Sequence, residues 1–403
     1  MFVRRSDTGI PSSAPPAVEA LPRVSVVRLE TYEPRAVRRA VEAALEPLGG
    51  LSAFVRPGQR VVLKPNFLRP ATPDRAVTTH PEIIRQVARL VRERGVEDAV
   101  VTDSCGFGTV KRCAGRLGLA GDDEPFVLAE ADDGFDVDAG GRYHRLQLSR
   151  RMVDADVLIN LPKVKTHAQM VLTGAVKNLF GAVVGLEKVQ WHMRSGRDPA
   201  EFARLLLHIF RAVSPALHIA DGVVGMEGNG PGAGTPRHLG LLVVSTDAHA
   251  LDLALCRILG IDPEAVFTLR AAKALGLLPS NGRIEVLGES LEAVRPAPKW
   301  RLARPVLPNV MAASPLLAGM LERLIAITPR VHNTVCTACG ECVRLCAPGA
   351  MSMGPGMRAG KKPEVIIDRK RCISCFCCQE MCPSGAITVK AGWLAQVLGV
   401  GTR

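Results

Sequence analysis

The chain of 403 residues is 47% hydrophobic but only 4% aromatic, and its formal net charge is +12. This length and apolar content predict two or three domains with a substantial core. The positive charge would suit a nucleic-acid partner, but the chain has no nucleic-acid-binding motif and few aromatic side chains to stack on bases, so no such partner is expected.

The first 21 residues are rich in Pro, Ser and Ala and contain no apolar segment of signal-peptide length, which predicts a disordered tail. Arg4 and Arg5 lack the hydrophobic region that follows a twin-arginine export signal. The most apolar stretch, 306–327, contains two prolines and two charged residues, so no transmembrane segment is expected. We therefore expect a cytoplasmic protein.

Short β-branched runs alternate with helix-patterned segments from about residue 22 to residue 290. This alternation predicts an α/β domain with a largely parallel sheet. Pro34 and Pro81 suit the first turns of two of the helices. Strands are predicted at 24–29, 60–64, 98–102, 157–161, 217–220 and 239–245, and helices at 34–48, 81–94, 199–213 and 248–259.

Polar side chains follow five of these six predicted strands. In open α/β sheets the ligand crevice lies beyond the carboxyl ends of the strands, so we expect these residues to share one site. The lysines suit a phosphate or carboxylate ligand. The predicted catalytic residues are Lys163, Lys165, His167, Asp103 and Asp247, and the predicted ligand-binding residues are Lys64, Asn66, Lys177, Asn178, Asp221, Glu227, Asn229 and Gly230.

Each group also has a plainer interpretation. Asp103 and Asp247 are well placed to cap helix N-termini. Lys163 and Lys165 share one face of an extended segment, where a solvated lysine pair is the usual finding. The glycine-rich segment 221–234 lacks both the dinucleotide-binding and the Walker pattern. It is compatible with a lid or backbone anion cradle and equally with a flexible connection.

Cysteines and histidines also occur outside these groups. Cys105 precedes a predicted helix whose N-terminus is expected to lower the pKa of its thiol, whereas Cys113 and Cys256 are expected to pack in the core. The scattered histidines are expected to be structural: His80, His144, His192, His208, His218 and His238.

Residues 60–275 resemble the domain of unknown function 362 family. The resemblance rests on the motifs Lys64-Pro-Asn66, His80-Pro81 and Asp103-Ser104, and on the segments 160–167, 174–181, 221–231 and 247–252. Members of that family often carry a fused ferredoxin-like module, and the family has no generally established reaction. The resemblance therefore implies an architecture rather than an activity.

The segment 291–330 is rich in Pro, Ala and Leu. We predict a tether followed by a docking helix over 316–327. A membrane-surface helix is the competing interpretation, but Arg323 is the only basic residue in that helix. Residues 391–403 form a predicted tail, with a short docking helix near Trp393.

Two runs of four cysteines occupy the C-terminal part, and each has the C-x2-C-x2-C-x3-C spacing of a 4Fe-4S site. Residues 331–390 closely resemble the bacterial-type two-cluster ferredoxin domain, in which the last cysteine of each run ligates the other cluster. Pro348 is displaced by one residue from the usual position and Cys377 is an additional cysteine, but neither change removes a ligand. The predicted ligands are Cys336, Cys339, Cys342 and Cys382 for cluster I and Cys372, Cys375, Cys378 and Cys346 for cluster II.

A zinc ribbon would instead show separated cysteine pairs, and a disulfide framework would suit a secreted chain. Basic residues gather between the two runs, at 358–371. They suit the steering of an acidic redox partner of the ferredoxin or flavodoxin type, or else form a solvated face that offsets the charge of the clusters.

The sequence thus predicts a cytoplasmic iron-sulfur oxidoreductase that passes electrons through two 4Fe-4S clusters to or from a small anionic ligand. No further organic cofactor is assigned. Two other functions stay open. The first is a non-catalytic electron-transfer subunit whose α/β domain docks a partner enzyme. The second is an iron-sulfur maturation or sensor protein.

Overall fold

A computed structural model describes residues 20–140, 143, 145–185, 187–195, 198–278, 282–303, 328–354 and 362–390. The predicted docking helix at 316–327, the C-terminal tail and all but residues 20 and 21 of the predicted N-terminal tail lie outside the described residues. Part of the basic segment 358–371 also lies outside them.

A ten-stranded sheet runs through the larger domain, with the order β12-β1-β11-β10-β7-β2-β3-β4 and with β8 and β9 attached beside β10. The pairings of β10 with β7, β7 with β2, β2 with β3 and β3 with β4 are parallel, whereas β11 pairs antiparallel with both β1 and β10. The predicted α/β class with a largely parallel sheet is therefore confirmed. The strands are β1 Arg23–Arg28, β2 Val61–Pro65, β3 Val100–Val101, β4 Val127–Leu128, β7 Val157–Leu161, β8 Lys163–His167, β9 Val171–Thr173, β10 Leu217–Glu227, β11 Thr235–Ser245 and β12 Glu285–Gly288.

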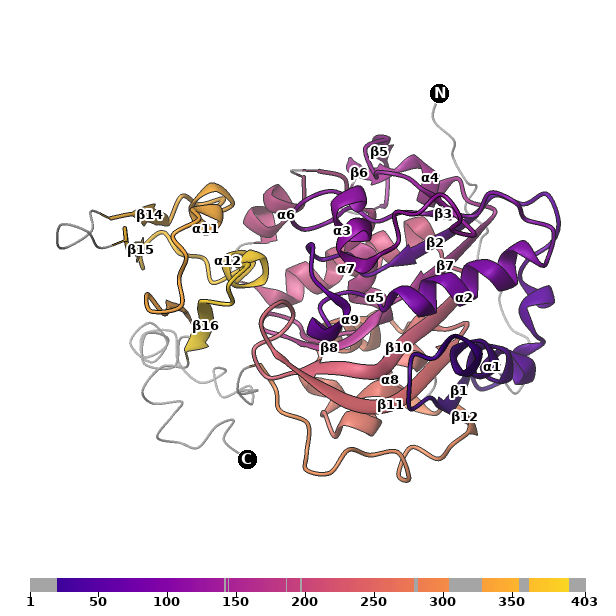
Figure 1. The fold of residues 1–403 in the computed structure, drawn as a ribbon. Helices are drawn as coiled ribbons and strands as arrows, with labels where there is room; N and C mark the ends of the chain where they lie inside the picture. Colours follow the sequence, from indigo (N-terminus) through magenta and orange to yellow (C-terminus); the bar gives the residue numbers. More distant parts are fainter. Residues whose placement is uncertain are drawn as a thin grey trace.

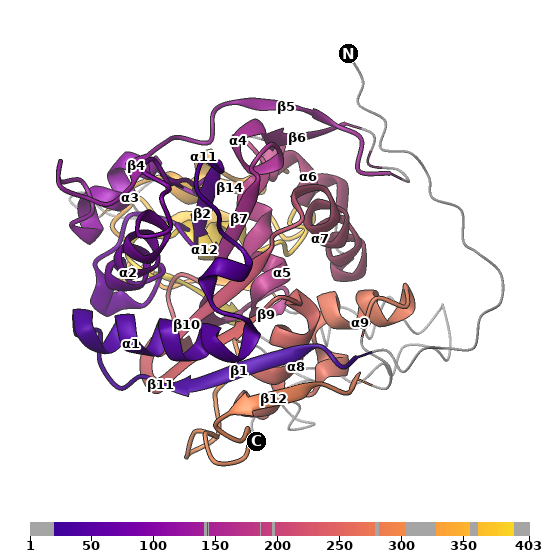
Figure 2. The same cartoon turned by 90° about the vertical axis from the view of Figure 1, so that its right-hand side faces the viewer.

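Helices cover both faces of this sheet (Figures 1 and 2). One apolar cluster joins the sheet to α1, α2 and α3, and a larger one joins it to α5, α7, α8 and α9. The central strands β2 and β7 are buried along their whole length, as expected for parallel strands covered on both sides. The helices are α1 Pro34–Leu45, α2 Pro81–Arg92, α3 Val110–Leu117, α4 Arg150–Val153, α5 Ala175–Asn178, α6 Glu187–Ser195, α7 Pro199–Val213, α8 Ala248–Leu259 and α9 Phe267–Ala274.

The elements with the clearest periodicity lie where they were predicted. Strand β7 and helices α7 and α8 have the predicted bounds. The glycine-rich segment differs, because β10 continues to Glu227 and only residues 228–234 connect it to β11. A Cβ at Gly225 would lie 2.9 Å from the Val164 carbonyl oxygen and from the Trp300 ring, so glycine here permits close strand packing rather than a loop.

The segment after β12 packs onto the α/β domain. Leu291, Val294 and Trp300 are each at most 5% exposed and belong to the larger apolar cluster. The predicted boundary at residue 290 stays a prediction, but the chain keeps contact with the domain as far as Arg301, which bonds to β10.

The small C-terminal module is built from two similar halves. Each half is a strand, a short helix and a strand, and the halves interlock because β13 pairs with β16 and β14 with β15, both antiparallel. In Figure 1 this module lies beside the larger domain, with α12 turned toward it. The elements are β13 Thr328–Val331, α11 Glu341–Arg344, β14 Met351–Met353, β15 Val365–Ile367, α12 Cys377–Met381 and β16 Ile387–Lys390, and a separate hairpin of the large domain is formed by β5 Gly134–Val137 and β6 Leu146–Ser149.

A buried carboxyl group links α8 to the start of α5. Asp252 Oδ1 accepts a 2.6 Å hydrogen bond from the Ala175 backbone N–H, and a Cβ at Gly174 would lie 1.9 Å from the same oxygen. Burial raises the pKa of Asp252 to about 7, although the N–H donors of Ala175 and Val176 act in the opposite direction. The carboxyl group of Asp252 therefore stays protonated in the folded chain up to pH values well above its ordinary pKa.

Because the folded state holds this proton more tightly than the unfolded chain, stability is expected to fall as pH rises toward 7, by up to about 1.4 kcal/mol per pH unit. Asp252→Asn keeps the acceptor oxygen and removes the titration. Thermal unfolding measured from pH 5 to pH 8 should give a flatter pH profile for Asp252→Asn than for the wild type. Parallel profiles would contradict this account of Asp252.

Candidate functional site

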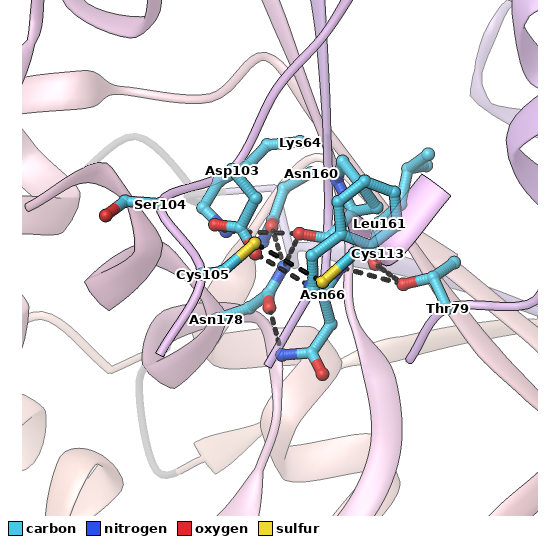
Figure 3. A network of polar contacts seen from close by, with 12 residues as sticks. Lys64, Asn66, Thr79, Asp103, Ser104, Cys105, Cys113, Asn160, Leu161 and Asn178 are labelled. Carbon is cyan, nitrogen blue, oxygen red and sulfur yellow. Dashed lines mark hydrogen bonds and ion pairs between the residues drawn. The ribbon is translucent and has the colours of Figure 1, made fainter. Parts of the chain in front are cut away.

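The carboxyl ends of the parallel strands hold two buried ion pairs. Lys64 Nζ at the end of β2 lies 2.8 Å from Asp103 Oδ1, and both side chains are at most 5% exposed (Figure 3). Asp103 Oδ2 also accepts a 2.7 Å bond from the Phe67 N–H. A Cβ at Gly181 would lie 1.8 Å from Asp103 Oδ1, so only glycine fits against this pair.

The second pair joins Lys163 to Asp221, at 2.7 Å. The Tyr32 hydroxyl donates to Asp221 Oδ1 at 2.7 Å and accepts from Lys163 Nζ at 2.8 Å. The pKa of Tyr32 is raised by burial and by the Asp221 charge. Tyr32 was not predicted as a site residue, because its only signal in the sequence is its place three residues after a predicted strand. Asp103 and Asp221 thus each neutralise one lysine.

Lys165 enters a chain of side-chain amides instead. Its Nζ donates to Asn66 Oδ1 at 2.7 Å and to the Val77 carbonyl at 2.6 Å. Asn66 Nδ2 donates to Asn178 Oδ1 at 2.7 Å, and Asn178 Nδ2 donates to Asn160 Oδ1 at 2.8 Å. Figure 3 shows the three amides, Asn66, Asn178 and Asn160, beside the Lys64–Asp103 pair. Burial lowers the pKa of Lys165 well below its ordinary value.

His167 ends β8 and meets a residue of the C-terminal module. Its Nδ1 accepts the backbone N–H groups of Gln169 (3.1 Å) and Met170 (3.2 Å), so the proton of the neutral ring lies on Nε2. Nε2 lies 3.0 Å from Glu380 Oε1 of α12. Burial lowers the pKa of His167, which favours this neutral form.

Glu380 is buried, with only 5% of its surface exposed. Burial raises the pKa of its carboxyl group, but His167, Lys177 and His192 outweigh that effect and bring the pKa to about 2. Glu380 is therefore an anion in the folded protein. It lies between the cluster-ligand candidates Cys378 and Cys382 in the sequence, which places a charged residue of the cysteine motif inside the strand-end site.

Lys177 lies in the same neighbourhood. Its Nζ stands 5.0 Å from the Phe180 ring centre and 5.6 Å from the Phe202 ring centre. Within the described part of the chain its Nζ forms no hydrogen bond or ion pair with a side chain. Burial lowers the pKa of Lys177, and the Glu380 carboxylate is the largest effect in the opposite direction.

Asn229 and Gly230 bind the C-terminal module rather than an open crevice. Gln379 Nε2 donates to the Asn229 carbonyl at 2.8 Å and to the Gly230 carbonyl at 3.1 Å, and Asn229 Nδ2 donates to the Ile387 carbonyl at 3.2 Å. The loop 228–234 is thus a docking surface for α12.

Two predicted site residues lie elsewhere. Glu227 pairs with Arg237 at 2.9 Å and with Arg301 at 2.7 Å. Asp247 accepts the N–H groups of His249 and Ala250 and caps α8. Asp247 follows β11, which is antiparallel to β10, so it lies at the opposite edge of the sheet from the parallel strand ends.

The eight predicted cluster cysteines line two cavities. Cys336, Cys339, Cys342 and Cys382 line one, and Cys346, Cys372, Cys375 and Cys378 line the other together with Cys377. This is the crossed arrangement expected of the ligands. Burial raises the pKa of the Cys342 thiol to about 11, with further contributions from the neighbouring Cys382, Cys336 and Cys339. The positive charge of an iron core would offset the repulsion between four such crowded thiolates, so these cysteines suit a 4Fe-4S cluster.

The two cysteine loops share an unusual backbone. Ala338 and Gly340 in the first run and Ser374 and Phe376 in the second all have positive φ angles, between 55° and 74°. In both runs the N–H four residues after the last cysteine donates to its sulfur, at 3.1 Å for Cys346 and 3.2 Å for Cys382. The two cysteine runs are therefore similar in backbone conformation as well as in the spacing of their cysteines.

The prediction of a low pKa for Cys105 is wrong. The N-terminus of α3 is capped by Thr109 and by the Glu130 carboxylate. The Cys105 sulfur lies 3.5 Å from the Cys113 sulfur, and this contact and burial raise the pKa of Cys105.

The family model Domain of unknown function (DUF362) matches residues 61–257, and a model of a 4Fe-4S dicluster domain matches residues 335–386. A thylakoid-associated protein of Synechocystis sp. (strain ATCC 27184 / PCC 6803 / Kazusa) is 40% identical over 294 residues, which are 71% of this chain and 89% of that relative. The chain belongs to the DUF362 family. Both resemblances predicted from the sequence are confirmed, and the C-terminal module of this DUF362 protein is a 4Fe-4S ferredoxin-type domain.

Two solved structures are distantly similar to this DUF362 protein. A protein from Thermotoga maritima matches 55% of this chain with a TM-score of 0.36 and 12% sequence identity. The lactate racemase apoprotein from Thermoanaerobacterium thermosaccharolyticum matches 60% of this chain with a TM-score of 0.37 and 11% sequence identity. The chain spans 57% of the length of each. Among the described residues, no helix has the length and apolar character needed to cross a membrane.

The glycine against the first ion pair gives a sharp test of the site. Gly181→Ala should displace Asp103 from Lys64 and destabilise the protein by about 3–5 kcal/mol, as for other broken buried pairs. Gly115→Ala is the matched control, because a Cβ there meets nothing within 4 Å in helix α3, and it should stabilise by up to about 1 kcal/mol. Equal thermal midpoints for the two variants would contradict the assigned role of Gly181.

Proposed function

We propose that this DUF362 protein is an iron-sulfur oxidoreductase that exchanges electrons between two 4Fe-4S clusters and a small anionic ligand bound at the strand ends of the α/β domain. The single observation that carries the proposal is the position of α12. This helix belongs to the second cysteine run, and its Glu380 lies 3.0 Å from His167 inside the strand-end site.

The cysteines fit two clusters, with Cys336, Cys339, Cys342 and Cys382 for one and Cys372, Cys375, Cys378 and Cys346 for the other. Each set lines its own cavity and includes one cysteine from the opposite run. When bound, such clusters supply one-electron transfer at potentials that the protein environment sets.

The amines of the strand-end site would hold and protonate the ligand. Lys64 and Lys163 are already neutralised by Asp103 and Asp221, so Lys165 and Lys177 remain to attract an anion. The lowered pKa of Lys165 makes its ammonium group a stronger acid than that of an ordinary lysine, which suits proton donation. His167 uses both ring nitrogens, one for backbone N–H groups and one for Glu380, and so serves better as an anchor than as a general acid.

The redox partner would be an acidic carrier of the ferredoxin or flavodoxin type. Arg344, Lys362, Arg369, Lys370 and Arg371 are exposed on the C-terminal module and suit electrostatic steering of such a partner. We propose a cytoplasmic protein, because clusters of this kind are labile to oxygen. The relative is named as thylakoid-associated, so fractionation should include the membrane surface.

The burial of the lysines favours a second function. Lys64, Lys163 and Lys165 are at most 1% exposed. A site that is closed in this way suits a non-catalytic electron-transfer subunit whose polar network only fixes the module. Native mass spectrometry on oxygen-free protein separates the two functions, because a retained organic anion besides iron and sulfide favours the enzyme.

The direct test is turnover. Dithionite-reduced protein, freed of excess reductant, should be reoxidised by some member of a panel of small organic acids and phosphate esters, followed by the visible absorption of the clusters. Lys165→Met should slow the responsive reaction by at least about 100-fold if the amine donates the proton. Lys273→Met, an exposed lysine, is the control. Equal rates in both variants would exclude Lys165 from the reaction.

Lys177 also gives a test that needs no substrate. Its charge lies close enough to the cysteine motif for Cys377 to influence its pKa. Loss of a buried cation should disfavour an added electron, so Lys177→Met should lower the reduction potential of the nearer cluster by on the order of tens of millivolts. Redox titration followed by electron paramagnetic resonance measures this shift, and an unchanged potential would remove Lys177 from the electrostatic environment of the cluster.

A further inference from the structure

The strand-end site contains more lysines than carboxylates of its own domain. Asp103 and Asp221 each pair with one lysine, Lys64 and Lys163 respectively. Among the described residues Lys165 and Lys177 form no such ion pair. The Glu380 carboxylate, which lies 3.0 Å from His167, raises the pKa of both amines against the larger effect of burial. The α/β domain by itself therefore buries two amines whose counter-charge comes from the other module.

The surrounding residues form a receptor that is shaped for one carboxylate. The backbone fixes the His167 tautomer, so that an N–H faces Glu380. His167 Nε2 and Glu380 Oε1 lie 3.0 Å apart, neither atom has a hydrogen-bond partner among the described residues, and both side chains are more than nine-tenths buried. We call His167, Lys165 and Lys177 the receptor group. It offers one neutral N–H donor and two ammonium groups, all from the α/β domain.

Glycines let α12 bring Glu380 into this receptor group. A Cβ at Gly232 would lie 2.4 Å from the Glu380 carbonyl oxygen, and one at Gly106 would lie 2.5 Å from the Met381 methyl group. Gln379 binds the carbonyl groups of Asn229 and Gly230 on the same surface. Polar contacts thus surround the one carboxylate that the module inserts.

We propose that the receptor group is a carboxylate-binding site, that Glu380 occupies it in cis in the docked state, and that a small organic carboxylate competes with Glu380 for it. The proposal rests on the proposed function, and it names the substrate class and adds a self-inhibitory contact. It explains how a ligand site can consist of lysines that are closed to solvent.

A purely structural ion cluster is the competing explanation. Burial of several charges stabilises a fold less than apolar packing of the same volume, so such a cluster needs another use. The receptor group also lies at the strand ends where α/β sheets bind ligands. These two points favour a ligand site that the module covers.

The test removes the carboxylate from the full-length protein, purified without oxygen. Glu380→Ala leaves the receptor group unpaired and opens space for a small anion. Its thermal midpoint should lie below that of the wild type and should rise saturably with sodium acetate. Sodium chloride at equal ionic strength should give no such rise, and the wild type should not respond, because its receptor group is filled.

Two further variants sharpen the result. Glu380→Gln keeps the volume without the charge and should be destabilised but insensitive to acetate. In Glu380→Ala/Lys177→Met, acetate should bind at least about tenfold more weakly than in Glu380→Ala. No response in Glu380→Ala, or an equal response in the wild type, overturns the proposal.

If Glu380→Ala is not recovered in folded form, hydrogen exchange on Glu380→Gln decides. The backbone amides of Gln379 and Glu380 both donate to the Phe376 carbonyl, and they should exchange faster than in the wild type once the charge is lost. Unchanged exchange overturns the proposal. None of these readouts involves electron transfer. If acetate binds to Glu380→Ala but no small organic acid reoxidises the reduced wild type, the oxidoreductase is rejected and the carboxylate site is retained. If a small organic acid reoxidises the wild type but acetate does not bind to Glu380→Ala, only the carboxylate site is rejected.

Discussion

The convergence of parallel strand ends in a dry interior is the constraint on which the rest of this structure depends. Strands β2, β7 and β8 bring lysines, amides and a histidine to one edge of the sheet, where each charge loses its hydration and needs a partner. Asp103, in the loop after β3, and Asp221, in β10, supply two partners. The α/β domain provides no further carboxylate within ion-pairing distance of Lys165 or Lys177 in the described residues, and this shortfall links it to the C-terminal module.

The module meets that need with the helix that also carries its cysteines. The six-residue stretch from Cys377 to Cys382 contributes ligand candidates to both cavities. Glu380 lies between two of these candidates in the sequence, Cys378 and Cys382. Folding of the cysteine loop and docking of the module therefore act on the same short segment. Gly232 permits this contact, since a Cβ there would lie 2.4 Å from the Glu380 carbonyl oxygen. Domain contact and charge balance are thus coupled through one turn of helix.

Much of this was predictable from local pattern, and the rest depends on contacts between distant residues. The cysteine spacing predicts the two loops because three of the four cysteines of each cavity are close in sequence, and the apolar runs predict β7, α7 and α8. The convergence of Lys64, Lys163 and Lys165 follows from parallel strands. Asp247 was misplaced because nothing local shows that β11 runs antiparallel. Glu227 and Arg301, like His167 and Glu380, meet across more than 70 residues, and no spacing rule reaches that far.

The buried surplus of positive charge has a further consequence for the electron-transfer role. A cluster gains negative charge on reduction, and low-dielectric surroundings make that gain costly unless cations lie nearby. Under the proposed function, Lys165 and Lys177 would stabilise an electron on the module as well as an anion in the site, because the Glu380 carboxylate of α12 acts on the pKa of both amines. A ligand carboxylate that takes the place of Glu380 would keep this charge balance, whereas an uncharged ligand would leave two amines unpaired. The same amines would therefore select for an anion and adjust the potential of its electron donor.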